Sequence, residues 1–377
     1  MGMTAGNRAS GRKAGSGRAG RPGPPLFICI CNGKVATMTT PPIRLGAATL
    51  DPPIFLAPMA GITDLPFRRA VARHGAGLVV SEMVASTEMV TPRPSTRAAV
   101  RAKAMVEENG VPVSVQIAGR EPGPMAETAR IVAGMGAAII DINMGCPARK
   151  VTGGLSGAAL MREPDRALSL VEAVVAAVPD LPVTLKMRLG WDDDCLNAPD
   201  LARRARDAGV RMITVHGRTR AQFYTGRADW AAIRAVRAAV PDLPLVANGD
   251  VVDAASADGA VTLSGADAVM VGRGAQGAPW RLAQIAHACH GAPVPVVPAG
   301  AALAEAVAAH HDDILSHYGR DLGMRVARKH LGWYAEAARL PDLRDARAAL
   351  MGAATPTAAV AAIAAVFSGA PGTAWAA

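Results

Sequence analysis

From residue 54 onward the chain repeats one pattern: a short apolar run, a polar or glycine-rich end, and then apolar residues at helical spacing. The apolar runs predict eight strands, at 54–60, 78–83, 113–118, 138–144, 183–188, 212–218, 245–250 and 268–274. The segments between them predict helices, among others at 64–74, 124–135, 164–178, 198–208 and 229–240. Strands that alternate with helices form parallel βαβ units, and eight such units over about 220 to 250 residues indicate an α/β fold, the (β/α)8 TIM barrel. A doubly wound sheet is the alternative, but eight repeats favour the barrel.

Within the predicted strands, alternation places certain polar side chains on one face. In the run 183–188, Lys186 alternates with Leu185 and Met187. Polar residues in three other strands occupy comparable positions: Gln116, His216 and Asn248. If the apolar face packs on the helices, the polar face points into the barrel near the carboxyl ends of the strands. Active sites of TIM barrels lie at that end, so the sequence predicts a site there.

The strand predicted at 138–144 ends in a loop that carries Cys146 between Gly145 and Pro147. Proline disfavours a helical conformation of the residue before it, and glycine permits unusual backbone angles, so we expect the thiol on a turn. A lone free cysteine is more often a small buried hydrophobe. The polar residues that accompany Cys146 favour a catalytic role instead.

Lys186 has two functional interpretations, because a lysine in a buried strand is rare without a partner. It is either a Schiff-base nucleophile or a fixed cation for an anionic cofactor. The last two strands end in Asn-Gly-Asp at 248–250 and Gly-Arg-Gly at 272–274. Exposed glycine N–H groups and an arginine are suited to a phosphate group, which favours the fixed cation. The sequence therefore predicts a phosphate-bearing cofactor with its reactive ring near Lys186.

Composition limits the class of protein. Half of the 377 residues are hydrophobic, enough for one large domain and a small one. The five cysteines form no paired CxxC motifs, which argues for a reducing compartment and against structural zinc, and no metal site is predicted. No run of about 18 apolar residues predicts a membrane span. The net charge of +9 does not by itself establish a polyanionic partner, because the first 50 residues supply seven of the nine excess charges.

Three regions are expected along the chain. Residues 1–38 are rich in Gly, Arg and Ser and predict a disordered basic extension, with Met38 as an alternative start of translation; no targeting signal is expected there. Residues 39–295 predict the barrel domain. Residues 300–377 predict a helical domain with helices at 303–315, 323–337 and 342–351, followed by an Ala-rich tail of open role.

Seven motifs together resemble the tRNA-dihydrouridine synthases, and their order and spacing most resemble the bacterial B subgroup. They are APMAGITD at 57–64, VQIAG at 115–119, DINMGCPARK at 141–150, LKMR at 185–188, VHGRTR at 215–220, ANGD at 247–250 and GR at 272–273. The resemblance covers about residues 43–350. The extension before Met38 and the Ala-rich tail lie outside it.

The resemblance implies an FMN-dependent enzyme that reduces uridine to 5,6-dihydrouridine in the tRNA D-loop. It implies a flavin site made of Pro58, Met59, Ala60, Gln116, Lys186, His216, Asn248, Gly249, Asp250, Gly272 and Arg273. NADPH or NADH would act as a transient reductant, and Cys146 would protonate C5 of the uracil after hydride transfer to C6. A free cysteine thiol suits this acid role because it is largely protonated at neutral pH.

The resemblance also implies a tRNA partner. Asn143, Arg188 and Arg218 are expected on the substrate side of the site, and Arg325, Arg328, Lys329 and His330, close to Trp333 and Tyr334, are expected on a surface that follows the RNA backbone. The target uracil must leave its stack to reach the barrel. The subgroup implies tRNA position seventeen, a cytoplasmic location, no membrane association and no stable protein partner.

Two other functions compete with this hypothesis. A small-molecule FMN barrel, such as a dihydroorotate dehydrogenase-like oxidoreductase, would not need the helical C-terminal domain. A non-catalytic tRNA-binding protein would not need Cys146 and Lys186, both of which are present.

Overall fold

The computed structural model describes residues 41–106 and 110–370. All of these residues belong to one compact unit. The predicted basic extension at 1–38 and the end of the tail at 371–377 lie outside the described residues.

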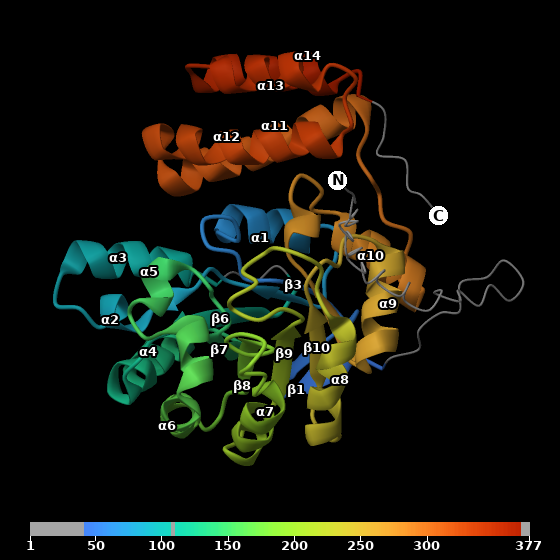
Figure 1. Cartoon of the computed structure of the whole chain (residues 1–377). Helices are drawn as coiled ribbons and strands as arrows, with labels where there is room; N and C mark the ends of the chain where they lie inside the picture. Colours follow the sequence, from blue (N-terminus) through green and yellow to red (C-terminus); the bar gives the residue numbers. More distant parts are fainter. Residues whose placement is uncertain (1–40, 107–109, 371–377) are drawn as a thin grey trace, which may run out of the picture. The chain divides into compact units, whose positions relative to one another are not determined.

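A closed barrel of parallel strands forms the centre of this unit (Figure 1). In the described part of the chain, eight strands follow one another around the ring, and β11 pairs with β3 to close it. Their bounds are β3 (Ile54–Leu56), β4 (Leu78–Val80), β6 (Val113–Ala118), β7 (Ile139–Met144), β8 (Val183–Arg188), β9 (Met212–His216), β10 (Leu245–Asn248) and β11 (Ala268–Val271). The predicted (β/α)8 TIM barrel is therefore confirmed.

The prediction of one continuous strand at 78–83 is wrong. The segment is divided into β4 and the short β5 (Val84–Ala85), and both pair with β6. Val80 pairs with Ser114 and Val84 with Ile117, so four steps on one strand face three on the other, which is a β-bulge. The bulge contains Glu82, whose carboxylate accepts a hydrogen bond from the backbone N–H of Gly61. The bulge thus directs a buried acid toward the loop that follows β3.

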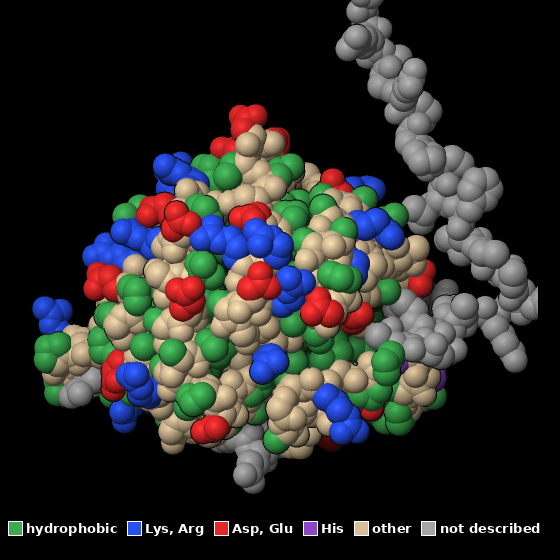
Figure 2. All heavy atoms as spheres, turned by 90° about the horizontal axis from the view of Figure 1, so that it is seen from below, with side chains coloured by type: hydrophobic (Ala, Val, Ile, Leu, Met, Phe, Trp, Pro, Cys, Tyr) green, Lys and Arg blue, Asp and Glu red, His purple; other side chains and the backbone are tan. Residues whose placement is uncertain are grey.

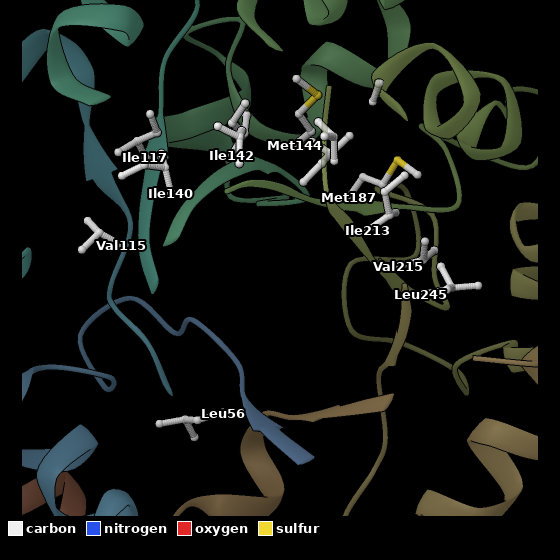
Figure 3. Close-up of a cluster of buried hydrophobic side chains, with 14 of the residues drawn as sticks. Leu56, Val115, Ile117, Ile140, Ile142, Met144, Met187, Ile213, Val215 and Leu245 are labelled. Atoms are coloured by element: carbon white, nitrogen blue, oxygen red, sulfur yellow. The ribbon is translucent and has the colours of Figure 1, made fainter. Parts of the chain in front are cut away.

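Hydrophobic side chains divide between the outside and the inside of the ring. Figure 3 shows outward-pointing residues of several strands, among them Val115, Met187 and Val215, which pack beneath the surrounding helices. A second cluster, including Phe55 and Met212, fills the ring near the amino-terminal ends of the strands. The antiparallel hairpin of β1 (Ile43–Leu45) and β2 (Ala48–Leu50) packs on that cluster. The carboxyl-terminal ends are left to polar residues.

Helices follow the barrel strands, and some of them begin at a residue whose side chain caps the first turn. Asp64 accepts a hydrogen bond from the N–H of Phe67 at 3.0 Å, and Asp253 forms a capping box with Ser256. The helices of the barrel region are α1 (Leu65–Ala72), α2 (Ser86–Met89), α3 (Pro94–Lys103), α4 (Pro122–Gly134), α5 (Arg149–Thr152), α6 (Pro164–Ala177), α7 (Ala198–Asp207), α8 (Trp230–Ala239), α9 (Ala254–Ser264) and α10 (Arg281–His290), with short 3-10 turns at Gly157–Arg162 and Arg273–Ala275.

Four further helices form two layers beside the barrel, α11 (Gly300–Tyr318) with α12 (Arg320–Ala337) and α13 (Leu343–Gly352) with α14 (Pro356–Phe367) (Figure 1). The Ala-rich segment is not an unstructured tail up to residue 370, because α14 packs on α11 and buries Ile363 and Phe367. Their core also takes in Trp280, which precedes α10. The domain boundaries at 295 and 300 remain a prediction.

Charged side chains of both signs alternate on the face shown in Figure 2. Exposed ion pairs of α6 and α7 have this character, for example Arg204 with Asp165 at 2.6 Å and Arg203 with Asp200 at 2.7 Å. Such pairs contribute little to stability. They also agree with the near balance of charges outside the first 50 residues.

Candidate active site

A cavity of about 640 Å³ opens at the carboxyl-terminal ends of the strands. Every barrel residue predicted for the site lines it: Pro58, Met59, Ala60, Gln116, Asn143, Cys146, Lys186, Arg188, His216, Arg218, Asn248, Gly249, Asp250, Gly272 and Arg273. These residues come from seven of the strands or the loops that follow them. The barrel brings strands that are distant in the sequence together, and the alternation of side chains along each strand directs these residues into the same cavity.

Cys146 lies on a turn directly after β7. Its N–H donates to Oδ1 of Asn143 at 3.0 Å, and the N–H of Gly145 donates to the same atom at 3.1 Å. The Cys146 carbonyl accepts from the N–H of Ala158 at 3.1 Å. A Cβ atom at Gly157, whose φ is +59°, would lie 2.9 Å from that carbonyl oxygen, so glycine is required there. The position of the half-buried thiol is therefore fixed by the Asn143 side chain and a tight backbone contact.

A buried chain of hydrogen bonds lies beneath this turn. Asn143 Nδ2 donates to Oε1 of Gln116, and Gln116 Nε2 donates to Oδ2 of Asp141, each at 2.7 Å. Thr184 Oγ1 donates to Oδ1 of Asp141 at 2.6 Å. Burial raises the pKa of Asp141, while the bonds from Thr184 and Gln116 oppose that rise. Asp141 and Thr184 were not predicted for the site, although both share the inward face of their strands with Asn143 and Lys186.

Lys186 provides a positive charge deep in the cavity. Its Nζ donates to Oδ1 of Asn248 at 2.9 Å, and Asn248 Nδ2 donates to the carbonyl of Met270 at 2.8 Å. Burial, followed by the charge of Arg188, lowers the pKa of Lys186 from 10.5 to about 8. The ammonium therefore stays mostly protonated at neutral pH. An ammonium group has three donors, so Lys186 can bind a ligand while it holds Asn248.

Two buried arginines hold the loop that follows β9. Arg188, 1% exposed, donates to the carbonyls of Gly145 at 2.8 Å and Phe223 at 2.9 Å. Arg218, also 1% exposed, donates to Asp250 Oδ2 at 2.6 Å and to the carbonyl of Gly226 at 2.8 Å. Both arginines line the cavity and do not reach the outer surface. Contact with a base inside the cavity stays a prediction.

His216 is neutral in this environment. Burial, followed by the positive charges of Lys186 and Arg188, keeps the pKa of His216 well below 6.5. Its Nε2 lies 3.2 Å from Nη1 of Arg218. Since a guanidinium only donates hydrogen bonds, Nε2 is the acceptor and the ring proton belongs on Nδ1.

The loops after β10 and β11 form the opposite end of the cavity. Gly249 has a φ of +108°, and a Cβ atom there would lie 2.8 Å from Cδ2 of His216. The Arg273 side chain is 59% exposed, and its guanidinium lies 3.6 Å from Asp250 and 5.2 Å from the ring centre of Tyr224. Tyr224 was not predicted for the site, because nothing in the local sequence pattern marks an exposed loop aromatic. The carboxylate of Asp250 pairs with Arg218 and Arg273. This carboxylate would repel an anionic ligand, so Asp250 is suited to contact such a ligand only through its backbone.

The loop after β3 connects the cavity to the C-terminal helices. Met59 N–H donates to Oγ1 of Thr63 at 2.9 Å, which shapes the turn that contains Pro58 and Ala60. Lys329 of α12 donates to the carbonyl of Gly61 at 2.9 Å. Lys329 thus has a partner within the protein. Its contact with tRNA stays a prediction, and Lys329 would have to make that contact with its remaining donors or after it releases Gly61.

The other basic residues of α12 differ in accessibility. Arg325 is exposed, and Arg328 is partly buried with Nη2 3.4 Å from the carbonyl of Ala353. His330 is only 2% exposed, and its ring centre lies 5.4 Å from that of Phe67. The prediction that His330 contacts tRNA is wrong, because helical spacing places it on the apolar stripe of α12. Tyr334 lies on the same stripe and is buried, so it is not available for base stacking either.

The described residues show neither a metal-binding cluster nor a membrane-spanning helix. Within residues 41–106 and 110–370, no three His, Cys, Asp or Glu side chains gather where they would hold a metal ion. No helix in this part of the chain has the length and apolar character needed to cross a membrane.

Comparison with known proteins gives consistent matches. The chain matches the family described as dihydrouridine synthase (Dus) over residues 55–368. It is 67% identical over 327 residues to a probable tRNA-dihydrouridine synthase of Rhodobacter capsulatus, which covers 86% of this chain and 98% of the relative. It is 45% identical over 320 residues to tRNA-dihydrouridine synthase B of Xanthomonas campestris, which covers 85% of this chain and 94% of that protein.

The fold also resembles a solved structure of 2-naphthoyl-CoA reductase in complex with 2-naphthoyl-CoA. The TM-score is 0.52 with 13% identity, over 67% of this chain and 52% of the other. At this level of identity the match supports the fold alone.

Proposed function

The chain belongs to the dihydrouridine synthase family, and from this membership we propose that it reduces a uridine of tRNA to 5,6-dihydrouridine with FMN as cofactor and NADPH or NADH as reductant. The observation that carries the proposal is the convergence of Cys146, Lys186 and the glycine-rich ends of β10 and β11 on one cavity. An acid, a fixed cation and a phosphate-binding end are the groups that this reaction needs.

The residues present fit a flavin mononucleotide. The turn containing Pro58, Met59 and Ala60 offers a largely apolar wall for a flat ring. Lys186 and Gln116 offer donors to its polar edge, and His216 lies beside them. Gly249 and Gly272, with Arg273, form an end of the cavity suited to a phosphate.

When bound, reduced FMN would supply a hydride to C6 of the uracil. Cys146 would give the proton: its S–H bond breaks, a C5–H bond forms, and the C5=C6 double bond becomes a single bond. The resulting thiolate takes a proton from solvent. The positive charges of Lys186 and Arg188 line the same cavity as this thiolate. Asn143 holds the turn that carries the thiol in place.

The RNA would approach from the open end of the cavity. Its uracil must leave the base stack to reach Cys146. Exposed Arg325 and, next to it, Lys329 lie on the helix that contacts the cavity loop at Gly61, which supports a role for α12 in binding the tRNA backbone. Reduction at tRNA position seventeen remains a prediction from the subgroup.

Two measurements test the proposal. The purified protein should be yellow, and denaturation should release FMN that mass spectrometry identifies; colourless protein that does not bind added FMN would contradict the cofactor assignment. Mapping of dihydrouridine in tRNA from a strain that lacks the gene should show one missing site. The parent gene should restore it, and the matched Cys146→Ala gene should not. An unchanged dihydrouridine map in the deletion strain would contradict the proposal that tRNA is the substrate, and with it the prediction of position seventeen.

A further inference from the structure

We propose that Asp141 is a positioning residue for the reaction: its carboxylate sets the direction of the amides of Gln116 and Asn143, and through them the turn that holds Cys146. This inference rests on the proposed function for its catalytic meaning. Asp141 is 5% exposed and does not line the cavity, so it acts through its neighbours rather than on a substrate.

The direction of the chain follows from the chemistry of its first member. A carboxylate only accepts hydrogen bonds, so the Gln116 group 2.7 Å from Asp141 must be the NH₂ group. The other end of Gln116 is then its carbonyl, which requires the NH₂ group of Asn143 at 2.7 Å. Asn143 is left with its carbonyl toward the backbone N–H groups of Gly145 and Cys146. One acceptor-only residue therefore determines the orientation of two ambiguous amides.

Reversal of the chain would release the cysteine turn. If residue 141 offered a donor to Gln116, the Gln116 amide would turn over and present its NH₂ group to Asn143. Asn143 would then have to turn as well, and its NH₂ group would face the N–H groups of Gly145 and Cys146. Donor would oppose donor, and the turn would lose its only side-chain acceptor among the described residues.

Thr184 decides what a neutral substitute at position 141 does. A hydroxyl can donate or accept, so in Asp141→Asn the Thr184 hydroxyl can accept from the new NH₂ group. The new carbonyl then faces Gln116, and the chain keeps its direction. In Asp141→Asn with Thr184→Val, either end of the new amide is unpaired on the valine side, so no partner there holds the amide in one direction and its NH₂ group can also face Gln116. Each single substitution should therefore be mild, and only the double substitution should populate the reversed chain.

The experiment compares the parent, Thr184→Val, Asp141→Asn and the double variant. Flavin reduction by NADPH and flavin reoxidation by tRNA are measured separately by stopped flow. Alkylation of Cys146 by iodoacetamide is followed by peptide mass spectrometry, which separates it from the other four cysteines of the chain. We expect reduction by NADPH to change less than reoxidation by tRNA in all four proteins, because that half-reaction does not need Cys146. Reoxidation by tRNA should fall about 10-fold further in the double variant than the product of the two single effects, a coupling of about 1.4 kcal/mol.

The alkylation rate keeps the two proposals apart. A non-additive change in Cys146 alkylation in the double variant supports the positioning role even if the parent fails to reduce tRNA, and that failure would count against the function only. Additive effects on both reoxidation and alkylation would overturn the positioning role while the parent remains an active synthase. Equal losses in both half-reactions would likewise overturn it, because they would mean general damage to the fold.

Discussion

Buried polar groups are treated differently in two regions of this molecule. At the cavity, the side chains of Asp141, Gln116 and Asn143 bond to one another and to the backbone. Where α1 meets α11 and α12, a histidine seam made of Phe67, His310, His330 and Tyr334 is held mainly by ring contacts. The rings of His310 and His330 lie 4.8 Å apart, and neither nitrogen of His330 has a hydrogen-bond partner in the described part of the protein.

The difference teaches what each region is built to do. Hydrogen bonds are directional, so the cavity network sets the orientation of each group, as a reaction site requires. Packing in the seam sets position but leaves buried nitrogens unpaired, which costs free energy. Burial, followed by the charge of Lys329, lowers the pKa of His330 to about 3, and burial keeps the pKa of His310 well below 6.5. The seam is therefore stable only with neutral histidines.

Loss of a buried arginine at the cavity should have the largest effect. Arg218→Ala removes bonds to Asp250 and to the carbonyls of Thr225 and Gly226 and leaves Asp250 without its closest cation. We expect the free energy of unfolding in urea to fall by about 3–5 kcal/mol. The control, Arg203→Ala, breaks an exposed pair with Asp200 and should cost less than about 1 kcal/mol. Similar losses in both variants would mean that the cavity arginines do not hold the loop.

Loss of the cavity cation should come next. Lys186→Ala removes a charge-assisted donor, so FMN should bind about 10- to 100-fold more weakly by fluorescence titration, and reduction by NADPH should slow. Arg273→Ala is the comparison, because its exposed guanidinium lies at the other end of the cavity. It should weaken FMN binding without slowing the reduction of bound flavin. A Lys186→Ala protein with parental affinity and parental reduction rate would contradict the fixed-cation role.

A substitution in the histidine seam should have the smallest effect on the free energy of unfolding, and this effect should appear only at acidic pH. The unfolded chain binds a proton at His330 below about pH 6.5, whereas the folded protein does not until about pH 3. His330 therefore contributes stability that is complete above pH 6.5 and is lost as the pH falls, by at most about 1.4 kcal/mol per pH unit.

His330→Phe should flatten this loss between pH 7 and 5 in urea unfolding. Asp64 titrates in the opposite sense, because burial raises its pKa to about 6, but it is present in both proteins and cancels in the difference. Parallel pH profiles for parent and variant would show that His330 does not make the seam sensitive to acid.

The sequence predicted the cavity better than the seam for a physical reason. Strand alternation in 183–188 separates inward Lys186 from outward Leu185 and Met187, and parallel strands bring such positions together at one end. The bulge at Glu82 leaves no such signal, because no glycine or proline marks an irregularity between residues 78 and 85. His330 was misplaced because the prediction followed its basic neighbours and not its helical spacing from Ala327 and Tyr334, which are buried.

The helix α14 was missed for a related reason. Alanine gives a helix little contrast between its faces, so only the spacing of Ile363 and Phe367 marked the buried side. The orientation of the Asp141 chain was also beyond the sequence, because an amide in a strand does not reveal which of its ends meets which partner.

The most direct test of the account is the rate at which tRNA reoxidises the reduced Cys146→Ala enzyme. The account predicts that this variant binds FMN and is reduced by NADPH at close to the parental rate, because that half-reaction needs no acid at this position. Reoxidation by tRNA should fall by about 10²-fold or more, the usual effect of losing a general acid, and Cys146→Ser should recover little of it. Reoxidation of the alanine variant at the parental rate would show that Cys146 is a packing residue and that the proton comes from elsewhere.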